Sequence, residues 1–404
     1  MADLLTAILT MNSIAHKGLA EFDPTRYHVS NSQSSPQAIL LRSADLHQYI
    51  LPTSVEVIAR AGAGVNNIPV SAYTKLGIPV LNTPGANANA VKELVIAGML
   101  IAARHLNHAL DFTNALPKDL DDDTMHKHIE AQKKQFSGHE LPGKTLGIIG
   151  LGHIGVKVAN AAIQLGMRVI GFDPAISIQN AWNLSSEVKK ADSLNDVAQA
   201  ADFISLHIPL MPNTRHLINH EFLEKTKKNL VLLNFARDPI VDHEAILTAL
   251  NQQQLHYYVC DFPRAEFLHH PKIITLPHLG ASTHEAEEHC AVMAAQQICR
   301  YLETGHVINS VNFPNVNLTQ TQGYRITVAN QNVPNVLAQM THQLSKHGLN
   351  IIDMINQSRD EIAYTIFDVN ACPSPSLMQA INEIPNVLRS RCIQPVTKRD
   401  PVPV

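Results

Sequence analysis

Three glycines with G-x-G-x-x-G spacing, Gly150, Gly152 and Gly155, stand between a short apolar run and an amphipathic segment. At such a turn, bare backbone amides at a helix N-terminus can bind a pyrophosphate. Gly150 would allow the tight turn, Gly152 the close approach of the phosphates, and Gly155 the packing of the helix on its strand. Asp173 follows about 20 residues later, where a carboxylate binds the ribose 2′-hydroxyl and repels a 2′-phosphate. The pattern predicts a site for NAD rather than NADP.

Three ionisable residues could carry chemistry beside this site. Arg237, Glu266 and His278 each follow one of three successive predicted strands. Each residue alone could be an ordinary surface charge or a hydrogen-bonded core histidine. Their shared position after successive strands favours a role in catalysis. A guanidinium can hold a carboxylate through paired hydrogen bonds, and an imidazole can move a hydroxyl proton near neutral pH. A carboxylate can orient that imidazole and stabilise its charged form. The set suits hydride transfer to or from a hydroxy acid.

The central segments predict the sheet that would position these groups. Apolar runs alternate with helical stretches, which is typical of a doubly wound parallel sheet with ligands at the carboxyl ends of its strands. Ser282 and Glu285 would form a capping box for a long helix that runs to about Glu303. The predicted strands are Thr145–Ile149, Arg168–Phe172, Phe203–His207, Leu230–Phe235, Tyr257–Asp261 and Lys272–Leu276.

The flanking segments predict two further folded parts. Asn89–Arg104 has the apolar spacing of a long helix, and the polar stretch Asp119–Gly138 is expected to be an exposed linker with helical character. The tail from Tyr324 to Ile393 reads β-α-β-β-α-β, the order of a ferredoxin-like module. The first part is a small α/β unit whose predicted strands are Leu4–Leu9, Ala38–Leu41, Val55–Ala59 and Ile78–Leu81.

Composition limits the classes of function. The chain has 404 residues, a formal net charge of −4 and no apolar run long enough to span a membrane. These values argue against nucleic-acid and membrane partners. The five cysteines show no C-x-x-C pair, so free thiols in a reducing cytoplasm are expected, without disulfides or a metal site.

Several motifs together resemble the D-isomer-specific 2-hydroxyacid dehydrogenases, over about the first 315 residues. The tail resembles an ACT domain, an amino-acid-sensing module. The resemblance implies a discontinuous substrate-binding domain (residues 1–100 and 284–316), an NAD-binding Rossmann domain (101–283) and an ACT regulatory domain (323–396). The motifs are RAGAGVNNI (Arg60–Ile68), NTPGANANAVKELVI (Asn82–Ile96), GKTLGIIGLGHIG (Gly143–Gly155), HIPLMPNT (His207–Thr214), NFARDPIVD (Asn234–Asp242), DFPRAE (Asp261–Glu266) and LPHLGAST (Leu276–Thr283).

The resemblance also implies roles for individual residues. Arg237, Glu266 and His278 would be catalytic, and Asp261 would contact the nicotinamide amide. Asp238 stands where the family usually has glycine. The other implied cofactor contacts are His153, Ile154, His207, Pro209 and Thr214. The implied substrate contacts are Arg42, Ser43, Arg60, Gly64, Val65, Lys133 and Lys134, of which the lysines would reach a neighbouring subunit's site. The implied effector positions are Asn330, Asn332 and Asn350. Serine-binding relatives carry histidine at the position of Asn330. The side chains of Asn332 and Asn350 are expected to converge on the effector.

The implied activity is NAD-dependent oxidation of 3-phospho-D-glycerate to 3-phosphooxypyruvate, the first step of L-serine biosynthesis. The basic cluster favours this phosphorylated substrate over those of related hydroxypyruvate or 2-oxoglutarate reductases. The alternative from a different functional class is a non-catalytic protein that senses NAD, similar to the C-terminal-binding corepressors. A homo-oligomer, dimeric or tetrameric, and regulation by L-serine or another small amino acid are also implied.

Overall fold

The computed structural model describes residues 5–319 and 323–394. The described chain divides into two compact units. The first contains the residues up to Ala86 and those from Glu287 onward, and the second runs from Asn87 to Ala286. The first unit holds two separate sheets, and the second holds one.

A five-stranded parallel sheet forms the N-terminal part of the first unit, in the order β2-β1-β3-β4-β5. The central strand β3 is buried along its whole length because apolar side chains pack on both faces. Helix α11 (His284–Thr304) packs on one face through Ala294, Ile298 and Tyr301. The strands are β1 (Thr6–Met11), β2 (Tyr27–Ser30), β3 (Ala38–Leu41), β4 (Val57–Arg60) and β5 (Val80–Leu81), with short helices α1 (His16–Leu19) and α2 (Val70–Lys75).

The second unit is built on a seven-stranded parallel sheet in the order β12-β11-β10-β9-β6-β7-β8. The strand order reverses at β6 and β9, which is the switch point where ligands bind in doubly wound folds. The strands are β6 (Thr145–Ile149), β7 (Arg168–Phe172), β8 (Lys189–Lys190), β9 (Phe203–Leu206), β10 (Leu230–Asn234), β11 (Leu255–Cys260) and β12 (Ile273–Thr275). The helices are α6 (His153–Gln164), α7 (Ile178–Asn183), α8 (Leu194–Ala200), α9 (His220–Glu224) and α10 (His243–Asn251), with 3₁₀ turns η2 (Asp238–Ile240) and η3 (Ala265–Phe267).

Helix α3 (Ala88–Arg104) belongs to this second unit. Its side chains Val91, Val95 and Met99 are buried in the same core as β6, β10 and β11. Gly98 allows the close approach, because a Cβ there would lie 3.1 Å from Val259. The boundaries therefore fall after Ala86 and Ala286, rather than after residues 100 and 283 as the sequence suggested.

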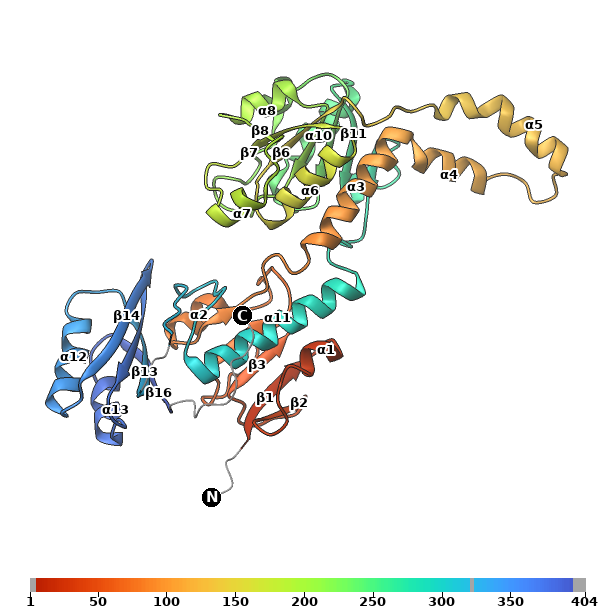
Figure 1. The fold of residues 1–404 in the computed structure, drawn as a ribbon. Coiled ribbons are helices and arrows are strands. Elements are labelled where there is room, and N and C mark those ends of the chain that lie inside the picture. The colour runs from red at the N-terminus through yellow and green to blue at the C-terminus, as the bar shows by residue number, and fades with distance from the viewer. Residues whose placement is uncertain (1–4, 320–322, 395–404) are drawn as a thin grey trace. The chain divides into compact units, whose positions relative to one another are not determined.

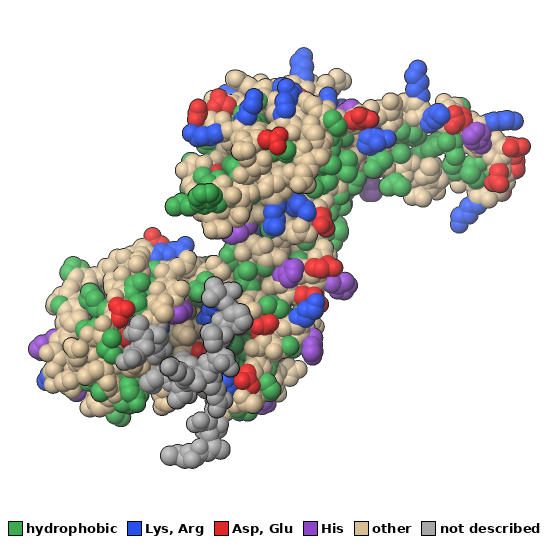
Figure 2. Space-filling view, in the orientation of Figure 1, with side chains coloured by type: hydrophobic (Ala, Val, Ile, Leu, Met, Phe, Trp, Pro, Cys, Tyr) green, Lys and Arg blue, Asp and Glu red, His purple; other side chains and the backbone are tan. Residues whose placement is uncertain are grey.

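A helical arm extends from the second unit, as Figure 1 shows. It consists of α4 (Leu106–Asn114), α5 (Asp122–Gln132) and the 3₁₀ turn η1 (Lys133–Phe136), so most of the predicted linker is helical. No residue of α4 or α5 is buried. The Phe112 ring stacks on His128 at 5.7 Å and ties the two helices together. Hydrophobic side chains gather along the arm in Figure 2, and Leu110 is 61% exposed.

The C-terminal module confirms the predicted β-α-β-β-α-β order, with an antiparallel sheet in the order β14-β15-β13-β16. Its helices cover one face around Ile326, Val328 and Phe367. The other face packs on the N-terminal part of the same unit through Tyr364 and Ile366. Residues 395–396 of the expected ACT domain lie outside the described residues. The elements are β13 (Tyr324–Gln331), α12 (Val336–Lys346), β14 (Ile351–Arg359), β15 (Ile362–Val369), α13 (Pro375–Asn382) and β16 (Val387–Ile393).

Two strands were not predicted from the sequence, and one helix cap was predicted at the wrong residue. The edge strands β2 and β8 were not predicted, because their sequences YHVS and KK lack an apolar run. The predicted capping box at Ser282 and Glu285 is wrong by one position. The Thr283 hydroxyl instead accepts a hydrogen bond from the Ala286 amide at 3.1 Å, and α11 begins at His284.

Candidate functional site

The glycine turn joins β6 to α6 at the carboxyl edge of the second unit's sheet. Gly150 has φ +95°, and a Cβ there would lie 2.5 Å from the His207 carbonyl oxygen. A Cβ on Gly155 would lie 2.0 Å from the Gly150 carbonyl oxygen. Gly152 is the N-cap of α6, and a Cβ there would meet no described atom within 4 Å. The fold itself therefore requires glycine at two positions, whereas the third leaves an open approach to the helix N-terminus that suits a pyrophosphate.

Asp173 follows β7 and lies against the glycine turn. Its carboxylate accepts hydrogen bonds from the amides of Leu151 at 2.8 Å and Ala175 at 2.9 Å. His153 and Ile154 begin α6 beside the turn, and the His153 side chain is exposed. This carboxylate stands where a dinucleotide's ribose is bound in such folds.

The loop from His207 to Thr214 borders the turn across the switch point. The Thr214 hydroxyl donates to the Pro209 carbonyl at 2.7 Å and accepts from the Met211 amide at 2.7 Å, which closes the loop. The His207 Nε2 atom lies 2.9 Å from the Ser205 hydroxyl. Burial lowers the pKa of His207 to about 3, so its ring is neutral at physiological pH.

The predicted catalytic residues all lie at the carboxyl edge of the second unit's sheet. Arg237 follows β10, Glu266 lies in η3 after β11, and His278 follows β12, and these three strands are neighbours. The buried Asn234 amide donates to the Arg237 carbonyl oxygen at 3.0 Å and shapes that turn. His278 has φ +57°, a conformation that non-glycine residues rarely adopt, and its ring meets Phe262 edge to face at 5.4 Å.

Glu266 and His278 do not form the expected hydrogen bond within the described part of the chain. The Glu266 Oε1 atom instead lies 3.1 Å from Arg264 Nε and 3.6 Å from His243 Nδ1. Arg264 lies in the motif DFPRAE with Glu266, but that motif did not indicate the contact, and His243, 23 residues away, lies outside every quoted motif. The carboxylate is therefore held by Arg264, with the His243 ring at a longer distance.

Asp261 has a role that sequence reasoning missed. This nearly buried carboxylate accepts hydrogen bonds from the amides of Leu279 and Gly280, each at 2.7 Å. Burial raises the pKa of Asp261 in spite of these bonds and the nearby charge of His278. The contact fixes the loop that begins at His278.

The predicted anion-binding residues of the first unit lie together after β3 and β4. The Arg60 guanidinium donates to the carbonyl oxygens of Arg42 and Gly64, at 2.9 Å for Arg42. Ser43 is exposed and Val65 half-buried beside them. The Arg42 guanidinium pairs with Glu287 at 2.8 Å, a contact that the sequence did not indicate. Lys133 and Lys134 lie instead in η1 of the second unit, where Lys133 pairs with Glu130.

The C-terminal asparagines do not converge within one chain. Asn332 follows β13 and donates to the Asp360 carbonyl at the β14–β15 turn, at 3.2 Å. Asn350 precedes β14, and its amide bonds to Asn370 beyond the far end of β15. Since β13 and β14 both pair antiparallel with β15, Asn332 and Asn350 lie at opposite ends of the sheet. The Asn330 side chain is buried and donates to the Gln331 carbonyl.

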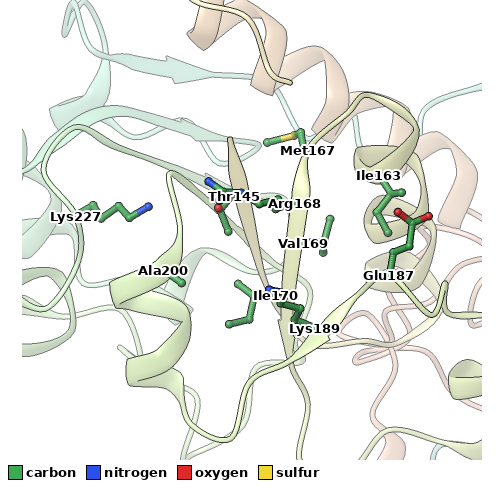
Figure 3. A pocket seen from close by; sticks show the side chains of 10 residues that line it. All are labelled: Thr145, Ile163, Met167, Arg168, Val169, Ile170, Glu187, Lys189, Ala200 and Lys227. Atoms are coloured by element: carbon green, nitrogen blue, oxygen red, sulfur yellow. The ribbon is translucent and has the colours of Figure 1, made fainter. Parts of the chain in front are cut away.

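A cavity of about 350 Å³ lies elsewhere on the second unit, at the amino ends of β6 and β7 (Figure 3). Thr145, Arg168 and Lys227 lie around it, and Lys227 pairs with Asp202 at 3.0 Å. None of the predicted site residues lines this cavity. Among the described residues, no helix is long and apolar enough to cross a membrane.

Comparison with known proteins identifies the family to which the chain is similar. Residues 99–286 match the family model of the D-isomer specific 2-hydroxyacid dehydrogenase NAD binding domain. D-3-phosphoglycerate dehydrogenase of Haemophilus influenzae is 32% identical over 342 residues, which are 82% of this chain and 79% of that protein. The enzyme of the same name from Methanocaldococcus jannaschii is 39% identical over 268 residues, 65% of this chain. The chain matches only 48% of the length of that relative.

A solved structure shows the same fold. The NAD⁺-bound 3-phosphoglycerate dehydrogenase of Entamoeba histolytica is 25% identical, with a TM-score of 0.60 over 78% of this chain and 100% of that one. The glycine turn and Asp173 both lie within residues 99–286, which match the NAD-binding domain model. On these grounds the chain belongs to the D-isomer-specific 2-hydroxyacid dehydrogenases, and its second unit carries the NAD-binding domain of that family.

Proposed function

We propose that this protein oxidises 3-phospho-D-glycerate to 3-phosphooxypyruvate with NAD, at the first step of L-serine biosynthesis. The observation that carries the proposal is the grouping of Arg42, Ser43 and Arg60 at one edge of the first unit's sheet. A phosphate dianion needs such cations and donors, whereas lactate or glycerate does not. The relatives described above bear the name of this activity.

The residues of the second unit would carry out the proton and carboxylate steps. Bound NAD supplies the hydride acceptor, held at the glycine turn and Asp173. The His278 imidazole takes the proton of the C2 hydroxyl as the base. Glu266 stabilises the resulting imidazolium, and Arg237 holds the substrate carboxylate through paired hydrogen bonds. The exposed Arg237 guanidinium, which donates to its own neighbour Ala236 at 2.7 Å, can exchange that bond for substrate.

NADH oxidation tests the proposal against the other activities of the family. Purified protein is assayed with 3-phosphooxypyruvate, hydroxypyruvate and 2-oxoglutarate, and kcat/KM is expected to be highest for 3-phosphooxypyruvate. A higher value for either of the others would assign the chain to a different D-2-hydroxyacid reductase. No turnover with any of them, together with tight NADH binding, would support the NAD-sensing alternative.

The proposal extends to a homo-oligomer in the cytoplasm, dimeric or tetrameric, with Lys133 and Lys134 reaching a neighbouring subunit. The exposed apolar side chains of the arm, including Leu106 and Leu110, support association. Light scattering coupled to size exclusion measures the mass in solution. A monomer would contradict this part of the proposal.

L-serine or another small amino acid is the proposed effector of the C-terminal module. Since Asn332 and Asn350 lie at opposite ends of one sheet, a shared ligand would need these residues from two modules. Isothermal titration with a small amino-acid panel tests this, and Asn350→Ala is expected to abolish inhibition while sparing basal activity. If none of the panel binds, the module has no effector role of this kind.

A further inference from the structure

Four charged or titratable side chains, Glu266 among them, form a closed ring. Asp238 Oδ1 lies 2.9 Å from His243 Nε2, and Asp238 Oδ2 lies 2.9 Å from Arg264 Nη1. Arg264 Nε reaches Glu266 Oε1 at 3.1 Å, and Glu266 Oε1 lies 3.6 Å from His243 Nδ1. Asp238 begins η2, His243 begins α10, and the other two residues flank the start of η3. Three separate segments of the second unit therefore meet at this ring.

Asp238 is directed toward this ring and not toward the neighbouring Arg237. Both of its carboxylate oxygens are engaged, one by an imidazole and one by a guanidinium. The side chains of Asp238 and His243 are each 20% exposed, so the pair is more sheltered than an ordinary surface ion pair. The carboxylate that stands where the family usually has glycine is therefore bound to His243 and Arg264.

Glu266 is anchored on one side only. Both of its contacts use Oε1, and within the described residues Oε2 has no hydrogen-bond partner. The His243 ring is itself fixed, because it packs edge to face on the buried Phe267 ring at 5.3 Å. These contacts restrain Oε1, whereas Oε2 is available to accept a hydrogen bond.

We propose that Asp238 is a positioning residue for Glu266: it fixes Arg264 and His243, which restrain Oε1 and leave Oε2 to His278. The inference rests on the proposed function, in which Glu266 stabilises the His278 imidazolium. Among the described residues, the Asp261 carboxylate, through charge, and the Phe262 ring also face His278.

Two single variants separate this role from simple structural support. In the reductive direction His278 must donate a proton, so kcat/KM falls as the pH rises through its titration midpoint. Asp238→Asn removes the contacts that fix Arg264 and His243, and Arg264→Gln removes the guanidinium that holds Oε1. Each variant is therefore expected to weaken the stabilisation of the imidazolium by Glu266 and to move this midpoint down by about half a unit. A purely structural role would leave the midpoint in place, and a change of local charge alone would move it in opposite directions in the two variants.

A double variant and a distant control complete the experiment. In Asp238→Asn/Arg264→Gln the same restraint on Glu266 is lost, so the midpoint is expected to move no further than in either single variant. Asp192, which pairs with Lys190 at 3.0 Å beside the opposite edge strand, is the matched control, and Asp192→Asn is expected to leave the profile unchanged. Thermal unfolding and NADH binding by each variant report whether it is folded.

The outcomes distinguish this inference from the function beneath it. If Glu266→Gln and His278→Ala lower kcat strongly but both ring variants keep the original midpoint, Asp238 has no positioning role and the proposed function stands. If folded Asp238→Asn and Arg264→Gln shift the midpoint in opposite directions, the variants act through charge alone and Asp238 has no positioning role. If His278→Ala keeps near-native turnover, the proposed function and the inference fall together.

Discussion

Asp261 holds Gly280 through a 2.7 Å hydrogen bond from the glycine amide to the carboxylate, across 19 residues of sequence. The same carboxylate accepts the Leu279 amide, so two successive backbone donors after His278 end on one buried acceptor. A Cβ on Gly280 would lie only 3.2 Å from the Asp261 Oδ2 atom, so the close approach favours glycine. The position of the proposed base His278, which follows β12, thus depends on Asp261, which follows β11.

Asp261→Ala is expected to loosen this loop. Two hydrogen bonds to a charged group are lost, each worth about 1.5–3 kcal/mol, so the unfolding free energy should fall by about 3 kcal/mol or more. We expect kcat to fall at least about tenfold, because misplacement of a catalytic group is costly. Urea unfolding and steady-state kinetics measure both effects, with Asp192→Asn as control. Unchanged stability and kcat would show that the clamp is unimportant.

The glycine turn offers a paired test of cofactor binding. Gly152→Ala adds a Cβ that meets no described atom, so stability should change by no more than about 0.5 kcal/mol. The Kd for NADH should nevertheless rise about tenfold or more, because the methyl group would occupy the approach of the phosphates. Gly155→Ala, whose Cβ would lie 2.0 Å from a carbonyl oxygen, is expected to destabilise the fold. Unaltered NADH affinity in folded Gly152→Ala would place the pyrophosphate elsewhere.

The Arg42–Glu287 ion pair makes a prediction about phosphate binding. Arg42→Ala should raise KM for 3-phosphooxypyruvate much more than for hydroxypyruvate, because only the former carries a phosphate. Glu287→Gln removes the carboxylate 2.8 Å from the guanidinium and should lower KM for the phosphorylated substrate. Equal losses on both substrates with Arg42→Ala would mean that this arginine is structural or binds a shared group.

The proton-transfer pair can be tested directly. His278→Ala is expected to lower kcat by about 10²–10⁴, the usual contribution of a positioned acid–base group. NADH affinity should be nearly unchanged. Glu266→Gln removes the charge that stabilises the imidazolium and should move the reductive pH profile to lower pH. Both are measured by NADH oxidation across pH, and near-native turnover of His278→Ala would refute the assignment.

The lowered pKa of Asp202 leads to a prediction of how the stability of the second unit depends on acid pH. Burial opposes its ionisation, but hydrogen bonds from the Thr145 amide and Lys227 outweigh this and hold the pKa of Asp202 below 3.8. Ionised Asp202 therefore stabilises the fold above its unfolded pKa, and this contribution is lost as pH falls through the lower folded value. Asp202→Asn should reduce the unfolding free energy near neutral pH, and the difference from the unsubstituted protein should shrink below about pH 4. A constant difference across acid denaturation would contradict this.

The sequence by itself determined the elements whose signals are local. The glycine spacing of Gly150–Gly155 predicts its own turn, because positive φ and close backbone contact admit little else. Apolar runs of four to six residues between helical stretches predict most strands of both parallel sheets. Parallel strands align their carboxyl ends. The placement of Arg237, Glu266 and His278 at one edge therefore followed from the order of strands and loops along the chain.

The tertiary structure alone decided which side chains meet. Asp238 and Arg264 are 26 residues apart, and Asp261 and Gly280 are 19 apart, so these pairs exist only because separate loops end beside each other. The same holds for Arg42 with Glu287 and for the separation of Asn332 from Asn350 within one chain. Spacing along a chain specifies backbone conformation within an element, whereas a contact between loops depends on sheet order and register, which no local pattern encodes.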